Sequence, residues 1–261
     1  MIVEYPLDKA NRIKLGAAFR PVPRVDLSID CAIEGQMGQA FVDDLHHPSV
    51  FKIRVGPFIY FAGDPTGPAG REMIGNISPE ELVMPSAPGW IEAAKAVYGI
   101  MLQEFDRYRF SAEKLSIDLL NQLYQASPFQ RQIRQMDAAF AARFWDRQHF
   151  IDLSQYDSPE DFIRRGIGYY LQVRQRLVGA AYASLACSRG IEVSVYIEDD
   201  YRRRGIATGL ASHLVLWSLN HNLEPHWDAA NPESCRLALK LGYTPAGTYS
   251  AYYLSKGSSL Q

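Results

Sequence analysis

The sequence has few cysteines and no long apolar run. Its three cysteines, Cys31, Cys187 and Cys235, lie far apart and form no Cys-x-x-Cys pair, so we expect neither a disulfide framework nor a cysteine metal site. The longest weakly polar run, 177–187, is about half of the roughly 20 residues that span a bilayer. Residues 1–20 lack the apolar centre of a signal peptide. We therefore expect a soluble protein of a reducing compartment, the cytoplasm.

Neither sign of charge is in clear excess. The chain has 27 lysines and arginines against 29 aspartates and glutamates, for a formal net charge of -2. This balance argues against a general nucleic-acid or membrane-surface binder, so any basic site must be local. The hydrophobic fraction of 47% and the charged fraction of 21% are those of a globular protein and exclude a disordered chain.

The 261 residues are enough for one large domain or two modest ones. In the first half, alternating apolar residues and turn residues predict strands, and apolar residues three and four apart predict amphipathic helices. Ser78 followed by Pro79 predicts a helix start. The expected strands are 40–45, 49–55 and 58–63, and the expected helices begin at 78 and cover 89–105 and 111–125.

After Pro128 the pattern changes to one of alternating strands and helices. The expected order is strand 129–137, helix 138–146, helix 160–166, strands 169–173, 177–186 and 191–197, helix 206–222, strand 226–229, helix 232–241 and strand 248–254. This order describes an α/β domain. We expect an α+β N-terminal domain over residues 1–127 and an α/β domain over residues 128–261.

The stretch DDYRRRGIATGLA, residues 199–211, places three arginines between a strand and a helix. The first turn of a helix presents unpaired N–H groups and the positive end of the helix dipole. Small residues at Gly205 and Ala207 would let a phosphate approach the backbone, and Arg202 would add charged donors. The stretch predicts a diphosphate site, although arginines at such a junction can also form only a solvated turn.

A second stretch, WDAANPESCRLALKLGY, lies about 20 residues downstream. Asn231 before Pro232 and Glu233 is a strong helix start, and Gly242 is a natural end for that helix. The series of strand, R-x-x-G-x-A turn, long helix, strand, Asn, helix and Leu-Gly-Tyr resembles the GNAT superfamily of N-acetyltransferases. The resemblance covers nearly all of residues 128–261. It implies a mixed, mainly antiparallel sheet flanked by helices.

Three shorter stretches, YRRRGIAT, HWDAAN and LALKLGY, are similar to one branch of that superfamily, the zwittermicin-resistance-type acetyltransferases. In that branch the catalytic domain follows an N-terminal half that loosely resembles FVDDLHHPSV and YFAGDP in this chain. The resemblance implies that residues 1–127 help to enclose the acceptor.

The resemblance implies that acetyl-CoA is the acyl donor, and it assigns residues to its parts. Val195 and Ile197 would present backbone groups to the pantetheine arm, although they can also be simply a buried strand face. Asn231 would reach the cofactor, although it can also act only as a helix cap. The pyrophosphate would sit on the backbone of Arg203, Arg204, Gly205, Ile206, Ala207 and Thr208, with Arg202 at the first position of the motif.

Acetyl transfer to an amine needs a neutral amine and a proton for the leaving thiolate. Glu192, near the start of the 191–197 strand, stands close to where many GNAT members carry their base, but a strand glutamate can also merely face solvent. Asp228 could attract a cationic amine or hydrogen-bond nearby backbone. The tyrosine that many members use as the acid is replaced by Ala238, counted from Asn231. Possible substitutes are Cys235, Tyr243, Tyr249 and Tyr252, or water.

The resulting expectation is a direct transfer of an acetyl group from acetyl-CoA to a primary amine of a small molecule, such as a metabolite or an antibiotic. We expect no metal site, since His46 and His47 have no partners at ligand spacing, and no nucleic-acid or membrane partner. A first alternative is a non-catalytic acyl-CoA binder, which Ala238 favours. A second is a phosphate- or RNA-binding module that uses the three arginines.

Overall fold

The structure, a computed structural model, describes residues 1–145 and 150–255. The chain forms two compact units, unit 1 with residues 1–107 and the chain from 248 onward, and unit 2 with residues 108–247. The division falls within β6 (Leu102–Ser111) and β12 (Thr244–Leu254). The expected boundary at 127 thus lies inside unit 2, because α5 (Ile117–Gln125) packs on α8 (Ile206–Asn220).

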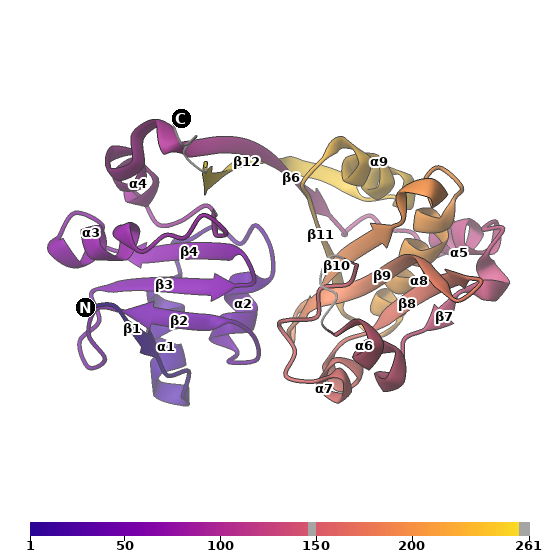
Figure 1. The fold of residues 1–261 in the computed structure, drawn as a ribbon, viewed down its shortest axis with the longest axis horizontal. Coiled ribbons are helices and arrows are strands. Elements are labelled where there is room, and N and C mark those ends of the chain that lie inside the picture. The colour runs from indigo at the N-terminus through magenta and orange to yellow at the C-terminus, as the bar shows by residue number, and fades with distance from the viewer. Residues whose placement is uncertain (146–149, 256–261) are drawn as a thin grey trace, which may run out of the picture. The chain divides into compact units, whose positions relative to one another are not determined.

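Unit 1 is an α+β arrangement (Figure 1). Its sheet follows the order β1-β2-β3-β4-β5-β12. The β4–β5 pair is parallel, while the β1–β2, β2–β3, β3–β4 and β5–β12 pairs are antiparallel. Besides parts of β6 and β12, its elements are β1 (Val3–Tyr5), α1 (Lys9–Ala18), α2 (Ser28–Ile33), β2 (Gln39–Val42), β3 (Val50–Val55), β4 (Phe58–Gly63), α3 (Pro68–Gly75), β5 (Leu82–Val83), α4 (Trp90–Tyr98) and the 3₁₀ turn η1 (Gly99–Met101).

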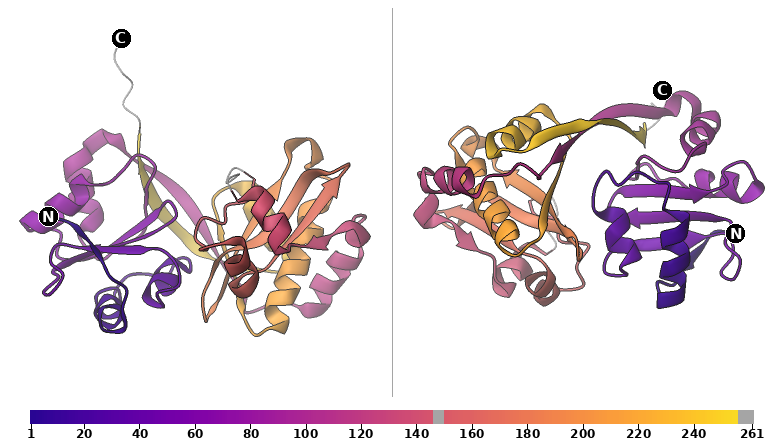
Figure 2. Two further views of the ribbon diagram at one scale, coloured as in Figure 1. Left: turned by 60° about the horizontal axis from the view of Figure 1, so that its bottom comes forward. Right: turned by 180° about the vertical axis from the view of Figure 1, so that it is seen from behind.

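The sheet of unit 1 is covered by helices. α1 and α2 lie on one face of β1–β4 (Figure 2), and α2 packs on β3. Trp90 of α4 stacks on Phe61 of β4 with ring centroids 4.8 Å apart. A buried ion pair also holds the unit together, because Lys52 Nζ lies 2.9 Å from Glu81 Oε1.

Two expectations for the first half of the chain are wrong. Ser78 begins a turn and not a helix, because the Glu81 carboxylate accepts from the Ser78 N–H at 3.0 Å and is fixed by Lys52. The next two residues then extend as β5, where the Leu82 N–H donates to the Pro57 carbonyl at 2.7 Å. The helix expected over 89–105 ends at Tyr98, since Gly99 has a φ of 53°. A strand follows from Leu102.

The strands of the sheet in unit 2 follow the order β6-β11-β10-β9-β8-β7. The β10–β11 pair is parallel, while the β6–β11, β7–β8, β8–β9 and β9–β10 pairs are antiparallel. Besides α5, α8 and parts of β6 and β12, its elements are the 3₁₀ turn η2 (Gln130–Gln132), β7 (Arg134–Gln135), α6 (Ala138–Phe144), α7 (Pro159–Arg165), β8 (Gly168–Val173), β9 (Arg176–Ala186), β10 (Gly190–Ile197), the 3₁₀ turn η3 (Asp199–Tyr201), β11 (Glu224–Ala229) and α9 (Pro232–Leu241).

The two faces of this sheet carry different helices. On one face α8 packs on β8, β9 and β10, and His213 of α8 stacks on Tyr169 at 3.9 Å. On the other face, which Figure 1 shows in front, Phe140 of α6 stacks on Tyr170 with centroids 3.7 Å apart. Neighbouring residues of a strand point to opposite faces. Tyr169 of β8 therefore contacts the α8 layer, and Tyr170 contacts the α6 layer on the other face.

Most expected elements of this half are present. The strand expected over 129–137 is reduced to Arg134–Gln135 and preceded by the turn η2. The helix expected over 138–146 ends at Phe144, and residue 146 lies outside the described residues. The long helix α8 is buried almost all round rather than on one face, because both the sheet and α5 pack against it.

Candidate active site

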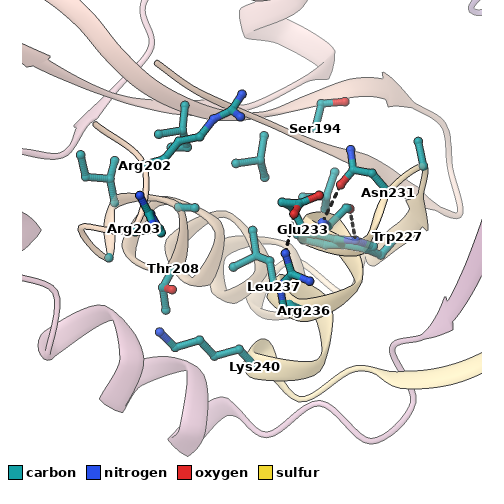
Figure 3. A pocket seen from close by; sticks show the side chains of 18 of the residues that line it. Ser194, Arg202, Arg203, Thr208, Trp227, Asn231, Glu233, Arg236, Leu237 and Lys240 are labelled. Carbon is teal, nitrogen blue, oxygen red and sulfur yellow. Dashed lines mark hydrogen bonds and ion pairs between the residues drawn. The ribbon is translucent and has the colours of Figure 1, made fainter. Parts of the chain in front are cut away.

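A pocket of about 960 Å³ lies in unit 2, where the ends of β10 and β11 meet the first turns of α8 and α9 (Figure 3). Both groups of residues that the sequence singled out, the arginine-glycine turn and the Asn231 helix, reach this pocket. Its lining residues are Val193, Ser194, Val195, Ile197, Tyr201, Arg202, Arg203, Gly205, Ile206, Ala207, Thr208, Trp227, Asp228, Ala230, Asn231, Glu233, Ser234, Arg236, Leu237 and Lys240.

The pocket opens where two parallel strands separate. β10 and β11 pair only over three residues each, Gly190–Glu192 with Glu224–His226. Beyond this point β11 pairs on its other side with β6, through Trp227, Asp228 and Ala229. Among the residues that the structure describes, the later part of β10 therefore has no partner strand on that side, and the pocket occupies the opening.

The free edge of β10 carries the two residues expected to use their backbone. The Glu198 N–H donates to the Val178 carbonyl at 3.1 Å, toward β9. Since backbone groups alternate along an extended strand, those of Tyr196 point toward β9 and those of Val195 and Ile197 point away from it. The backbones of Val195 and Ile197 thus face the opening between the strands.

The turn before α8 has an unusual backbone. Arg203 has a φ of 60° and Gly205 a φ of 80°, and this alternation of left- and right-handed residues directs successive N–H groups to one side. The Gly209 N–H donates to Gly205 at 3.1 Å, so the preceding helical N–H groups have no carbonyl within the helix to bond. A Cβ at Gly205 would meet only Pro128 at 3.8 Å. The positive φ, rather than lack of space, therefore favours glycine here.

Cations lie on both sides of the pocket. Arg202 and Arg203 line it from the turn, and Arg202 pairs with Asp199 at 2.7 Å. Arg204 does not line it, since its guanidinium lies 5.0 Å above the Tyr201 ring. Arg236 and Lys240 also line the pocket, from α9, and were not predicted from the sequence. Their four-residue spacing on a predicted helix was the available signal, because residues so spaced share a helix face.

Asn231 caps α9 and also lines the pocket. Its Oδ1 accepts from the Ser234 N–H at 2.9 Å and caps α9. The same side chain lines the pocket (Figure 3). Because the amide oxygen is used by the cap, its NH₂ end is the group that can donate to a ligand.

Glu192 is not brought into the pocket lining. It is buried at the closed end of the opening, where His226 Nδ1 lies 3.0 Å from its Oε2. Ser194, two residues further along the same face of β10, does line the pocket and donates to Ser184 Oγ at 2.9 Å. His226 and Ser194 were not predicted from the sequence. The register of β10 with β11 places His226 opposite Glu192, and no local pattern shows that register.

Asp228 lines the pocket, whereas the expected substitutes for the missing tyrosine are mostly elsewhere. The Tyr243 hydroxyl donates to the Pro225 carbonyl at 2.8 Å, and burial raises its pKa well above the usual range. Arg107 donates to Tyr249 at 3.2 Å within unit 1, where Lys95 also lies 4.9 Å from the Tyr252 ring. Burial raises the pKa of the Cys235 thiol.

The comparison with protein families assigns the chain. A family model described as GNAT acetyltransferase matches residues 26–252. The chain belongs to the GNAT acetyltransferase family. The match extends through most of unit 1 as well as unit 2, so the family pattern includes the N-terminal part of the chain.

Individual relatives agree with this assignment. An N-acetyltransferase of Bacillus subtilis, YdfB, itself uncharacterized, is 23% identical over 229 residues, which cover 83% of this chain and 85% of the relative. A GCN5-related N-acetyltransferase-like protein from Streptococcus suis superposes with a TM-score of 0.80 at 26% identity, over 95% of this chain and 100% of that one.

A GNAT-family protein from Novosphingobium aromaticivorans, called a putative acetyltransferase, has a TM-score of 0.54 at 16% identity, over 91% and 98% of the two chains. At that identity the likeness concerns the fold alone. Together these structures confirm the expected mixed, mostly antiparallel sheet flanked by helices.

The GNAT chain is thus an acyltransferase. Within residues 1–145 and 150–255, no helix is both long and apolar enough to cross a membrane. Within the same ranges, no group of three histidine, cysteine, aspartate or glutamate side chains is arranged to hold a metal ion.

Proposed function

We propose that this GNAT protein transfers an acetyl group from acetyl-CoA to a primary amine of a small molecule. The observation that carries the proposal is the opening between β10 and β11, which leaves the backbones of Val195 and Ile197 free beside a pocket. An extended chain with amide groups, such as the pantetheine arm, can pair with such an edge as a neighbouring strand would.

The donor's phosphates fit the turn that begins α8. The N–H groups of Arg203 to Thr208, the helix dipole and the Arg202 side chain all favour an anion. Arg236 and Lys240 add positive charge from α9. Acetyl-CoA supplies the acetyl group when bound, and these residues of the chain bind and orient it.

The acceptor amine must lose a proton before or during the reaction. We propose that Glu192 accepts this proton through a water molecule. Its carboxylate is buried, and Glu192 lies two residues before Ser194, which lines the pocket. Asp228 lines the same pocket and would attract a cationic amine. We do not carry Tyr243 into the mechanism, because its hydroxyl donates to Pro225.

The acceptor proposed here is a small-molecule metabolite or antibiotic. The proposed place of the chain in the zwittermicin-resistance-type branch rests on the three short sequence stretches alone. The acceptor-enclosing role expected of residues 1–127 likewise stays a prediction. All three cysteines are thiols, which fits the reducing conditions of the cytoplasm.

The first experiment is a thermal-shift measurement with acetyl-CoA, CoA and ATP. A ligand that binds the native state raises its stability by mass action, so we expect a shift with both CoA species and none with ATP. Acetylation of a panel of amines then separates an enzyme from a non-catalytic acyl-CoA binder. If CoA binds and no amine is acetylated, the binder is correct. If RNA binds, CoA has no effect and affinity falls steeply with salt, the arginines form a phosphate-binding module instead.

A further inference from the structure

The side chain of Ser234 is held by a buried indole at the pocket wall. Trp227 is 2% exposed, and its Nε1–H donates to Ser234 Oγ at 3.0 Å, drawn as a dashed line from Trp227 in Figure 3. An indole N–H can only donate, so the serine oxygen is the acceptor of this bond. The hydroxyl hydrogen of Ser234 must therefore point elsewhere.

That hydrogen is available to a ligand. Ser234 lines the pocket, and within the described ranges its hydroxyl donates to no side chain or carbonyl. The position of the residue is fixed twice, by the indole and by the Asn231 cap that accepts its backbone N–H at 2.9 Å. Ser234 also lies in the first turn of the ten-residue helix α9, where the helix dipole favours a negative charge.

The other pocket hydroxyls are committed or distant from this end. Ser194 donates to Ser184 at 2.9 Å, Tyr201 lies in the turn η3, and Thr208 lies on the first turn of α8. Ala238 is fully buried, does not belong to the pocket lining and has no hydroxyl, so the position at which the resemblance leads us to expect a tyrosine supplies no donor here.

We propose that Ser234 is a catalytic residue that donates a hydrogen bond to the sulfur of the acyl thioester as it leaves. This inference rests on the proposed function. In the reaction the amine nitrogen forms a bond to the acyl carbon, and the carbon–sulfur bond breaks with its electron pair left on sulfur. The proton released by the nitrogen ends on the sulfur. Ser234 stabilises the negative charge on sulfur until that proton arrives, and Trp227 positions Ser234.

A binding measurement tests this without turnover. The thiol of bound CoA is titrated by the ultraviolet absorbance of its thiolate, in the wild type and in Ser234→Ala. A hydrogen bond to the thiolate lowers the thiol pKa, so we expect it to rise by about one unit in Ser234→Ala. Ser234→Thr, which keeps the hydroxyl, should titrate like the wild type. Ser218→Ala, which removes a buried hydroxyl of α8 outside the pocket lining, is the matched control and should also titrate like the wild type.

Trp227→Phe keeps an aromatic ring and removes the indole N–H, so it should raise the thiol pKa by less than Ser234→Ala does. In steady state, Ser234→Ala should lower kcat about ten- to a hundredfold with little change in the KM for acetyl-CoA. If CoA binds both proteins and the two titrations coincide, Ser234 does not contact the sulfur, while the proposed function stands. If the wild type does not bind CoA, both the proposed function and the role of Ser234 are wrong.

Discussion

Glu192 and His226 form a buried pair at the point where β10 and β11 stop being neighbours, with His226 Nδ1 3.0 Å from Glu192 Oε2. The parallel register places these two residues opposite each other. The pair therefore fixes the closed end of the opening that forms the pocket. It also means that the proposed base has a partner that the sequence did not reveal.

Glu192→Gln should lower kcat/KM about a hundredfold or more, because general base catalysis contributes about 10²–10⁴-fold. The measurement is the pH–rate profile, whose acidic limb should disappear in this variant. His226→Gln is the matched control, since it removes the partner and keeps the carboxylate; it should lower kcat/KM less than Glu192→Gln does. An unchanged rate and profile in Glu192→Gln would remove Glu192 from the mechanism.

Gly205→Ala should weaken CoA binding although there is room for the added carbon. An alanine at a φ of 80° costs about 1–2 kcal/mol, and relief of that strain would turn the N–H groups of the turn away from the phosphates. Gly205→Glu should weaken binding further by adding a negative charge. Calorimetric titration measures both. Gly75→Ala, at a position with no heavy atom within 4 Å of the added carbon and a negative φ, should bind CoA as the wild type does. Wild-type affinity in Gly205→Glu would mean that the turn does not hold the donor.

Asn231 allows capping and ligand binding to be separated. Asn231→Ala should lose about 1 kcal/mol of stability, because the Ser234 N–H loses its acceptor, and should also lose CoA affinity. Asn231→Ser keeps a capping oxygen and lacks the amide NH₂, so we expect near-wild-type stability with weaker CoA binding. Urea unfolding and CoA titration of both variants give the answer. Wild-type CoA affinity in Asn231→Ser would leave Asn231 as a cap alone.

His213 predicts a pH dependence of stability. Its ring stacks between Tyr169 at 3.9 Å and Tyr124 at 4.3 Å, and burial lowers its pKa. Burial also raises the pKa of Tyr169 to about 12, so this tyrosine stays neutral near pH 6. Because the folded pKa lies below that of the unfolded chain, about 6.5, stability is full above that pH and is lost as pH falls toward the folded pKa.

His213→Phe keeps a ring in the stack and removes the titrating group. Its free energy of unfolding should therefore fall less between pH 7 and 5 than that of the wild type, as measured by urea unfolding at each pH. His221→Phe, which replaces a histidine exposed at the end of the same helix, is the matched control. Parallel curves for the wild type and His213→Phe would show that His213 does not titrate in this range.

Lys52 and Glu81 predict a large cost for a single substitution in unit 1. Both side chains are below 10% exposed and 2.9 Å apart. Lys52→Met should destabilise the protein by about 3 kcal/mol, since the buried carboxylate loses its 2.9 Å cation and keeps the Ser78 N–H and the more distant Arg54, 3.9 Å away. Combining it with Glu81→Gln should recover most of the loss. Lys95→Met breaks a pair that is half exposed and should change the unfolding midpoint little. Equal losses in Lys52→Met and in the double variant would exclude a penalty from the unpaired charge.

The sequence predicted best what depends on neighbouring residues. Asn231 before Pro232 marked a helix start that the structure contains, because capping is a local interaction. The same local signal failed at Ser78, where Lys52, far away in the chain, holds Glu81 and the backbone extends into the sheet. At Gly99 the local helical pattern continued, but a positive φ ended the helix.

The sequence by itself determined the family pattern: the strand, the arginine-glycine turn, the long helix and the Asn231 helix follow in fixed order, and their local conformations need few distant contacts. Tertiary structure alone decided which side chains share a site. The register of β10 with β11 pairs Glu192 with His226, and the packing of α9 on β11 brings Trp227 to Ser234. The Glu192–His226 pair joins residues 34 positions apart in the chain, and a one-residue shift of a strand would exchange its buried and exposed faces. No local pattern encodes that choice.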